Sequence, residues 1–236
     1  PRAPAALCSR SPDRLGAPPS VAPQHPERAA QQPETRNRAY GLNGVSLGGH
    51  VADEELGERR FDPFWAAAEE LDVPIWVHPL GVPELDRLEG NGFLSNVIGN
   101  PLDTTIALSH MIFEGVLDRF PNLKVASAHG GGYLASYADR SDYGCMRAPQ
   151  ACNRTLNRRP TDYLRDMYFD SLVFTSENLR HLTAQYGADH LLLGSDYPYT
   201  WNDAPVDHVL DTPSLSDAEK IAILGGNAME LWGLSA

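Results

Sequence analysis

The chain has 236 residues, 42% of them hydrophobic and 21% charged, which is typical of a soluble globular protein with a buried core. Its net charge of −12 argues against nucleic acid or an anionic membrane surface as a partner. The three cysteines lack CxxC spacing, which favours a reducing compartment and argues against a disulfide framework or a zinc ribbon. No apolar run reaches the ~18 residues that span a membrane, so no membrane anchor is expected and the cytoplasm is the expected location.

Residues 1–38 differ in composition from the rest of the chain. They are rich in Pro, Ala, Arg and Gln and hold eight of the nineteen prolines. Such a segment buries too little apolar surface to offset its ordering entropy, so an irregular tail is predicted. The alternative is that the N-terminal part of the domain is absent or altered here. The predicted division is therefore an irregular segment over 1–38 and one folded domain over 39–236.

Five apolar segments of the strand type follow, separated by segments of the helical type. They lie at 44–50, 74–77, 124–128, 167–169 and 190–195. Each ends on a polar residue: His50, His78, His129, Asp170 and Asp196. Alternating strands and helices predict a parallel sheet, and polar groups after several different strands favour a (β/α)₈ barrel over a doubly wound sheet. An eight-stranded barrel would need about three more strands.

Helices are predicted between these strands and after the last one. They are expected at 62–71, 100–120, 133–143, 162–166, 176–186, 216–224 and 227–232. Ser216 with Glu219 three residues later is the pattern of a capping box. Residues 79–100 contain four glycines and two prolines and are expected to form a long loop, which in a compact domain usually has a function. Residues 144–160 are predicted to be irregular and basic.

His78, His129 and Asp196 form a candidate metal site. Neutral imidazoles and a carboxylate are ligands for a catalytic divalent ion such as zinc, which polarises a substrate oxygen or generates hydroxide. Each residue alone also has a structural explanation, because a polar strand end can be satisfied locally and Asp before Tyr-Pro can begin a turn. Three such residues at matching positions favour the site. Asp170 equally suits a helix N-cap, and His110 is expected to be structural.

Five arginines follow the glycines at 130–132 in an otherwise acidic protein: Arg140, Arg147, Arg154, Arg158 and Arg159. They form either a solvated basic loop or a site for a substrate carboxylate, which a planar guanidinium binds well.

The chain resembles a known protein family. The matching segments are Trp76–Pro79, Phe120–Val125, Ala128–Gly132, Leu193–Pro198 and Gly226–Ala228. They resemble the amidohydrolase-related group of metal-dependent TIM barrels, which is typified by aminocarboxymuconate semialdehyde, γ-resorcylate and 5-carboxyvanillate decarboxylases. The resemblance covers about residues 40–236.

The resemblance implies a role for each candidate residue. His78 and Asp196 are expected to be metal ligands, with zinc as the expected ion and manganese as the alternative. His129 is expected to be the acid/base beside the metal, with Asp196 also counted as catalytic, and the glycines after His129 are expected to let the substrate approach. Arg147 resembles an arginine that binds substrate carboxylate, in some members across a dimer interface, so a homodimer is expected.

The chain departs from the family pattern in one respect. The family's first strand carries a His-x-His pair of ligands, and no His-x-His occurs in this chain. Residues 20–35 resemble the third strand and the start of its helix, so strands one and two have no counterpart. His78 and Asp196 would then be two firm ligands, where catalytic zinc usually has three or more from protein. A longer parent protein, or a truncated or mis-framed product, is therefore expected.

The leading functional prediction is metal-dependent, non-oxidative decarboxylation of an aromatic or unsaturated carboxylic acid. His129 would deliver the proton that replaces CO₂ on carbon. Hydrolysis of a lactone, ester or amide by metal-bound hydroxide uses the same ligands and is the first alternative. The second alternative is a catalytically inactive homologue, because the His-x-His pair is missing.

Overall fold

A parallel β-sheet forms the centre of the molecule in the computed structural model, which describes residues 6, 8–11, 15–21, 23–31, 43–82, 85–152, 156–199 and 201–234. Its strands are β1 (Val45–Leu47), β4 (Ile75–Val77), β5 (Val125–Ser127), β6 (Tyr168–Asp170) and β7 (Leu191–Leu192). They lie side by side in chain order, each parallel to the one before. Ser20 pairs in parallel with Ser46 and so extends the β1 edge. This unreversed order is that of successive βα units in a barrel and confirms the predicted parallel sheet.

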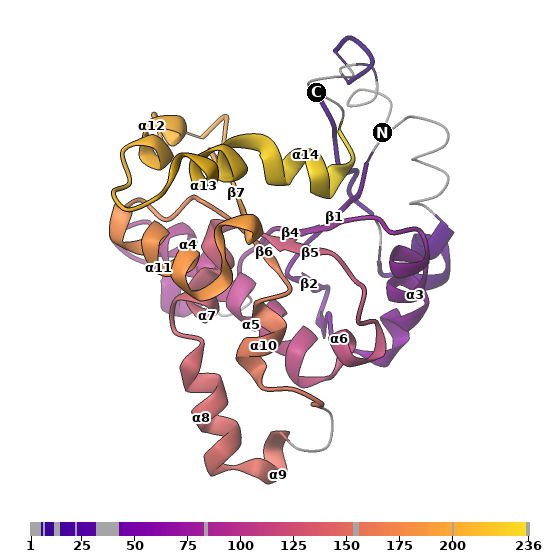
Figure 1. Ribbon diagram of the computed structural model, residues 1–236. Coiled ribbons are helices and arrows are strands. Elements are labelled where there is room, and N and C mark those ends of the chain that lie inside the picture. The colour runs from indigo at the N-terminus through magenta and orange to yellow at the C-terminus, as the bar shows by residue number, and fades with distance from the viewer. Residues whose placement is uncertain are drawn as a thin grey trace.

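The helices cover the sheet on two sides. The elements are α3 (Asp62–Glu70), α4 (Leu94–Val97), α5 (Gly99–Phe113), α6 (Val116–Arg119), α7 (Gly132–Ser136), α8 (Asp139–Arg147), α9 (Pro149–Cys152), α10 (Pro160–Leu164), α11 (Ser176–Tyr186), α12 (Pro205–Leu210), α13 (Asp217–Ile221) and α14 (Asn227–Trp232). The short helices are η1 (Arg59–Phe61), η2 (Leu85–Leu88), η3 (His129–Gly131), η4 (Ala188–His190) and η5 (Ala222–Gly226). In Figure 1, α5, α6 and α10 lie on one side of the sheet and α14 on the other.

Alternation along the strands explains these two layers. Ile75 and Val77 belong to the main core, together with buried side chains of α3, α5 and α11. Trp76 points to the opposite face, where it packs with α14 and its ring centroid lies 6.3 Å from that of Trp232. The strands thus expose one apolar face to the helical layer and a second to the C-terminal helix.

Several predicted elements are corrected by the structure. His50 does not end a parallel strand: it begins β2 (His50–Val51), which forms an antiparallel pair with β3 (Glu54–Glu55). The helix predicted over 100–120 is two helices, because Gly115 adopts φ 72° between α5 and α6. The predicted loop 79–100 contains η2 and α4, and the predicted irregular segment 144–160 contains the end of α8 and all of α9.

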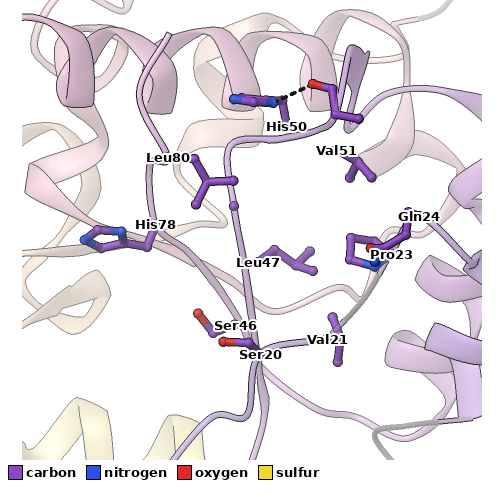
Figure 2. Close-up of a pocket in the computed structure, with 12 residues that line it drawn as sticks. Ser20, Val21, Pro23, Gln24, Ser46, Leu47, His50, Val51, His78 and Leu80 are labelled. Atoms are coloured by element: carbon purple, nitrogen blue, oxygen red, sulfur yellow. Dashed lines mark hydrogen bonds between the residues drawn. The ribbon is translucent and has the colours of Figure 1, made fainter. Parts of the chain in front are cut away.

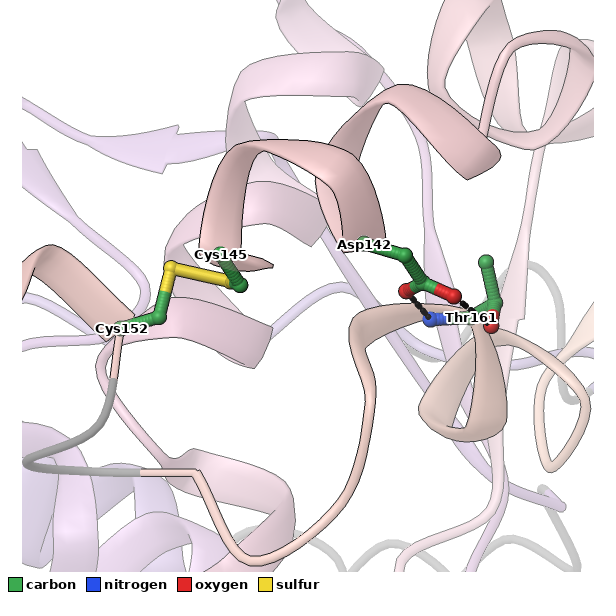
Figure 3. The surroundings of a disulfide bond; sticks show 4 residues. All are labelled: Asp142, Cys145, Cys152 and Thr161. Carbon is green, nitrogen blue, oxygen red and sulfur yellow. Dashed lines mark hydrogen bonds between the residues drawn. A yellow bond between two sulfur atoms is a disulfide. The ribbon is translucent and has the colours of Figure 1, made fainter. Parts of the chain in front are cut away.

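The pair α8 and α9 forms an arm that projects from the body (Figure 1). None of the residues of α8 is buried. Asp142 ties this helix to α10, because its carboxylate accepts hydrogen bonds from the Thr161 N–H at 3.0 Å and hydroxyl at 2.7 Å (Figure 3). At its other end, Cys145 and Cys152 form a disulfide with Cα atoms 5.3 Å apart. No disulfide framework was predicted; the bend between the helices nevertheless brings these two cysteines together, while Cys8 is free and buried.

The N-terminal prediction lies partly outside the described residues. Within the described part of 1–38, residues 26–31 are helical and Ala29 belongs to the main core. The division into an irregular segment and a domain therefore stays a prediction. In the part of the chain that the structure describes, none of the helices is both long and apolar enough to cross a membrane.

Candidate metal centre

The three residues that the sequence singles out meet at one edge of the sheet. His78 follows β4, His129 follows β5 and Asp196 follows β7, and parallel strands place such residues at the same edge. Each offers one ligand atom, and these atoms lie within 4.8 Å of one another. The imidazole rings of the two histidines are 5.3 Å apart at 67°. This spacing suits a divalent cation between two nitrogens and a carboxylate oxygen.

The side chain of His78 has a defined hydrogen bond. Its Nδ1 lies 2.9 Å from the carbonyl oxygen of Pro79. Because a carbonyl only accepts, the proton of the neutral ring resides on Nδ1 when this bond forms. The lone pair of Nε2 is then available to a metal, as in histidine ligands whose second nitrogen is held by an outer acceptor.

His129 has a buried ring nitrogen that is not paired. Among the described residues, none forms a hydrogen bond with its Nδ1. Burial lowers the pKa of His129, the charge of His78 lowers it further, and Asp170 and Asp196 oppose the decrease. The ring is therefore favoured in its neutral form, with a lone pair that can bind a metal or accept a proton.

Asp170 holds the turn that presents His129. Its buried carboxylate accepts the backbone N–H groups of His129 at 3.0 Å, Gly130 at 2.9 Å and Leu172 at 3.1 Å. Burial raises the pKa of Asp170, and His129 and these three donors oppose the increase. Asp170 is the last residue of β6 and bridges two βα turns; it does not cap the next helix, α11, whose N-cap is Thr175.

The backbone at the site is unusual for side-chain-bearing residues. His129 has φ 56° and Asp196 has φ 58°, in the left-handed region that only a few per cent of such residues adopt. The glycines after His129 have a packing role. A Cβ on Gly130 would lie 2.4 Å from Val173, and one on Gly132 would lie 2.3 Å from the Pro101 oxygen. These glycines allow close approach of the chain itself, where the sequence suggested approach of a substrate.

A small cavity of about 120 Å³ adjoins the metal centre. His129 and Asp196 line it, together with Asn96, Val97, Asn100, Pro101, Leu172, Phe174 and Trp201. The ring of Trp201, one of these lining residues, is stacked on that of Phe93, with centroids 6.1 Å apart and planes at 8°. The sequence indicated a functional loop over 79–100 and identified His129 and Asp196, but not the seven other lining residues, because these come from three separate segments. A mostly apolar lining with a few polar groups is typical of a small-molecule site.

A larger hollow of about 650 Å³ lies against β1 and β2. Of the three site residues only His78 lines it, and Figure 2 shows Leu80 between His78 and His50. The smaller cavity is therefore the better substrate site, because two of the three site residues line it.

Arg147 lies away from this cavity. It is the last residue of α8, on the projecting arm, and it is exposed. Arg158 and Arg159, also candidates from the sequence, pair with Asp166 and Asp162. Arg154 lies outside the described residues. Among the described residues of one chain, the cavity lining contains no arginine.

Comparison with known proteins places the chain in a family. Residues 2–234 match the amidohydrolase family. A 2-amino-3-carboxymuconate-6-semialdehyde decarboxylase of Dictyostelium discoideum is 31% identical over 231 residues, 98% of this chain and 64% of that protein. The chain thus spans less than two thirds of the length of this relative.

Two solved structures of high similarity are also decarboxylases. The 5-carboxyvanillate decarboxylase of Sphingomonas paucimobilis matches with a TM-score of 0.92 at 26% identity, over 99% of this chain and 71% of the other. The enzyme of Novosphingobium aromaticivorans, complexed with manganese and 4-hydroxy-3-methoxy-5-nitrobenzoic acid, matches with a TM-score of 0.91 at 26% identity, over 99% and 68%. The chain therefore belongs to the amidohydrolase family and has its TIM-barrel type of fold.

Proposed function

We propose that this chain carries the active site of a metal-dependent decarboxylase that acts, without oxidation, on an aromatic or unsaturated carboxylic acid. The observation that carries the proposal is the convergence of His78, His129 and Asp196 beside a small apolar cavity. An engineered apolar cavity of about 150 Å³ binds benzene, so a cavity of about 120 Å³ suits part or all of one ring. The relatives named above, all decarboxylases, support the same chemistry.

His78 and Asp196 would hold the divalent ion. The free Nε2 of His78 and the carboxylate of Asp196 fit such an ion. When bound, the ion polarises an oxygen of the substrate. Imidazole nitrogen favours zinc, and manganese is the alternative because the Novosphingobium aromaticivorans enzyme binds it.

His129 would supply the proton. The bond between the substrate carbon and its carboxylate breaks, CO₂ leaves, and the electron pair that remains on this carbon takes a proton from the His129 imidazolium. Water then returns a proton to the imidazole of His129. Burial lowers the pKa of His129, so its protonated form is a stronger acid toward carbon, and the nearby substrate carboxylate favours that form.

A His129→Asn variant of the complete protein tests this assignment. With the 5-carboxyvanillate and 2-amino-3-carboxymuconate-6-semialdehyde named in the relatives as trial substrates, we expect CO₂ release to fall by about 10²-fold or more while bound metal is retained. Loss of the metal would make His129 a ligand instead. Wild-type turnover in the variant would contradict the proposal, and a ring-opened acid without CO₂ would indicate a hydrolase.

We also propose a homodimer in which Arg147 reaches the cavity of the partner. Tyr143 and Met146 on the same arm are 61% and 65% exposed, although large apolar side chains are usually covered. Helix α8 has no buried residue, and among the described residues of one chain the cavity lining has no arginine; both observations are explained if the arms of two copies meet.

Complementation between variants tests the shared site. His129→Asn and Arg147→Ala chains are each expected to be inactive as homodimers. Mixed one to one after unfolding and refolding together, they should recover about a quarter of wild-type activity, because half of the dimers contain one intact site of two. No recovery, with dimers confirmed by light scattering, would show that Arg147 does not act across the interface.

A further inference from the structure

Asp103 on α5 is a buried carboxylate that the metal centre described above does not include. Only 2% of its surface is exposed. Burial raises the pKa of Asp103, and backbone donors together with the nearby His50 and His78 oppose the increase. Because a buried carboxylate is costly without hydrogen bonds, its partners indicate its role.

Those partners belong to the segment that follows His78. The Oδ2 atom of Asp103 accepts the N–H of Leu80 at 2.6 Å and the N–H of Gly81 at 3.2 Å. From the other side, Nε2 of His50 lies 3.2 Å from the carbonyl oxygen of Gly81. The carboxylate also leaves no space at Gly49, where a Cβ would lie 2.6 Å from its carbon and both oxygens.

One peptide group connects Asp103 to His78. The N–H of Leu80, which Asp103 accepts, and the carbonyl of Pro79, which lies 2.9 Å from Nδ1 of His78, belong to the same peptide unit. Because a peptide unit is planar, fixing the direction of its N–H also fixes the direction of its C=O. The contacts therefore run from the Asp103 carboxylate through the Pro79–Leu80 peptide to the imidazole of His78.

We propose that Asp103 is the positioning residue for His78: it orients the Pro79–Leu80 peptide, whose carbonyl holds the proton on Nδ1 and leaves Nε2 for the metal. This inference rests on the proposed metal centre. In many metal sites, a carboxylate that is not itself a ligand orients a metal-bound histidine. Asp103 would act in the same way, with a backbone peptide between its carboxylate and the imidazole of His78.

Two substitutions at this position separate hydrogen bonding from charge. Asp103→Ala removes the acceptor. Asp103→Asn can keep it, because a single oxygen accepts both N–H groups and the amide oxygen can occupy the same place. A matched control is Asp118→Ala, which removes a carboxylate that accepts the Asn157 N–H at 3.0 Å and the Tyr163 hydroxyl at 2.5 Å.

Cobalt(II) binding to the complete protein gives the first measurement, by calorimetry and by the visible absorption of the bound ion. Asp103→Ala is expected to raise Kd by about 10- to 100-fold and to change the spectrum. Asp103→Asn should bind nearly as tightly as the wild type, and Asp118→Ala should leave Kd unchanged. Unchanged Kd in Asp103→Ala, or equal losses in the Ala and Asn variants, would overturn the proposal.

Nitrogen-15 NMR of the metal-free protein gives a second measurement. We expect His78 to carry its proton on Nδ1 in the wild type and in Asp103→Asn, and to mix tautomers in Asp103→Ala, where amide exchange at Leu80 should also accelerate. If the wild type binds no cobalt, the metal centre is wrong, and the tautomer still decides the role of Asp103. A wild-type tautomer in Asp103→Ala would contradict that role.

Discussion

At the scale of single residues, burial of His129 predicts a dependence of stability on pH in the metal-free protein. Its pKa is lowered, so the charged ring costs more in the folded than in the unfolded state. Above the ordinary histidine pKa of about 6.5 both states are neutral and the stability is fully present. As the pH falls below that value, the unfolded state binds the proton first, and stability is lost until the folded pKa is passed.

A His129→Asn variant should therefore lose less free energy of unfolding between about pH 6.5 and pH 5 than the wild type does. Urea denaturation at a series of pH values measures this difference. His181→Asn, on the exposed side of α11, is the control and should follow the wild-type curve. Parallel curves for the wild type and His129→Asn would show that burial does not shift this histidine.

The turn after His129 predicts a large penalty for a single methyl group. Gly130 has φ +60°, and a Cβ there would lie 2.4 Å from Val173. Gly130→Ala combines backbone strain with overpacking, and we expect the free energy of unfolding to fall by about 2–4 kcal/mol. Gly90→Ala is the matched control, because Gly90 has φ +107° but nothing within 4 Å of the added atom. If Gly90→Ala lost as much stability as Gly130→Ala, the contact with Val173 would contribute nothing to the loss.

The sequence could identify the candidate site residues, but not what holds them in place. His78, His129 and Asp196 are chemically distinctive and stand after strand-like segments, so their positions could be read directly. Asp103 and Asp170 bind backbone N–H groups of distant turns, and backbone partners leave no trace in side-chain patterns. Supporting residues of this kind become visible only once the fold is known.

At the scale of secondary-structure elements, the sequence predicted helix bounds best where a local sequence pattern marks the helix. Helix α13 has the expected capping box, in which Ser216 accepts the Glu219 N–H and the Glu219 carboxylate accepts the Ser216 N–H at 2.7 Å. Helix α14 has the predicted bounds. The end of helix α8 was not predicted: the sequence prediction stopped at residue 143, whereas the helix runs to Arg147, and none of its residues is buried.

The disulfide of the arm predicts both a thiol count and a loss of stability. Of the three cysteines only Cys8 is free, so titration of the unfolded, non-reduced chain should find one thiol, and three after treatment with a dithiol. The bridge closes a short loop, with the two cysteines seven residues apart. Its removal in Cys145→Ser is expected to cost about 2–3 kcal/mol by the loop-entropy estimate.

Cys8→Ser serves as the control for the thiol count. It should remove the one reactive thiol and leave the bridge intact. Three thiols in the wild-type chain without a reductant would show that Cys145 and Cys152 remain reduced in solution.

At the scale of the whole molecule, the order of the sheet connects fold and site. Because β1, β4, β5, β6 and β7 are neighbours in chain order, the turns that follow them collect at one edge, where His78, His129 and Asp196 meet. The alternation of strand and helix was enough to predict this parallel arrangement. It could not predict that α14 packs on the opposite face, because the contact of Trp76 with Trp232 joins residues far apart in the chain.

The proposed metal ligands, His78 and Asp196, come from two separate βα units, so a divalent ion is expected to stabilise the entire fold, because an unfolded chain does not hold these ligands together. At a free metal concentration of 100 Kd, the gain is about 2.7 kcal/mol. Calorimetry with zinc and with manganese should show a rise in Tm that EDTA reverses, and comparing the two ions at equal concentration ranks them. His78→Asn should lose most of the increase, whereas His110→Asn, whose ring pairs with Glu114 outside the site, should retain it. An equal Tm increase in both variants would place the ion elsewhere on the molecule.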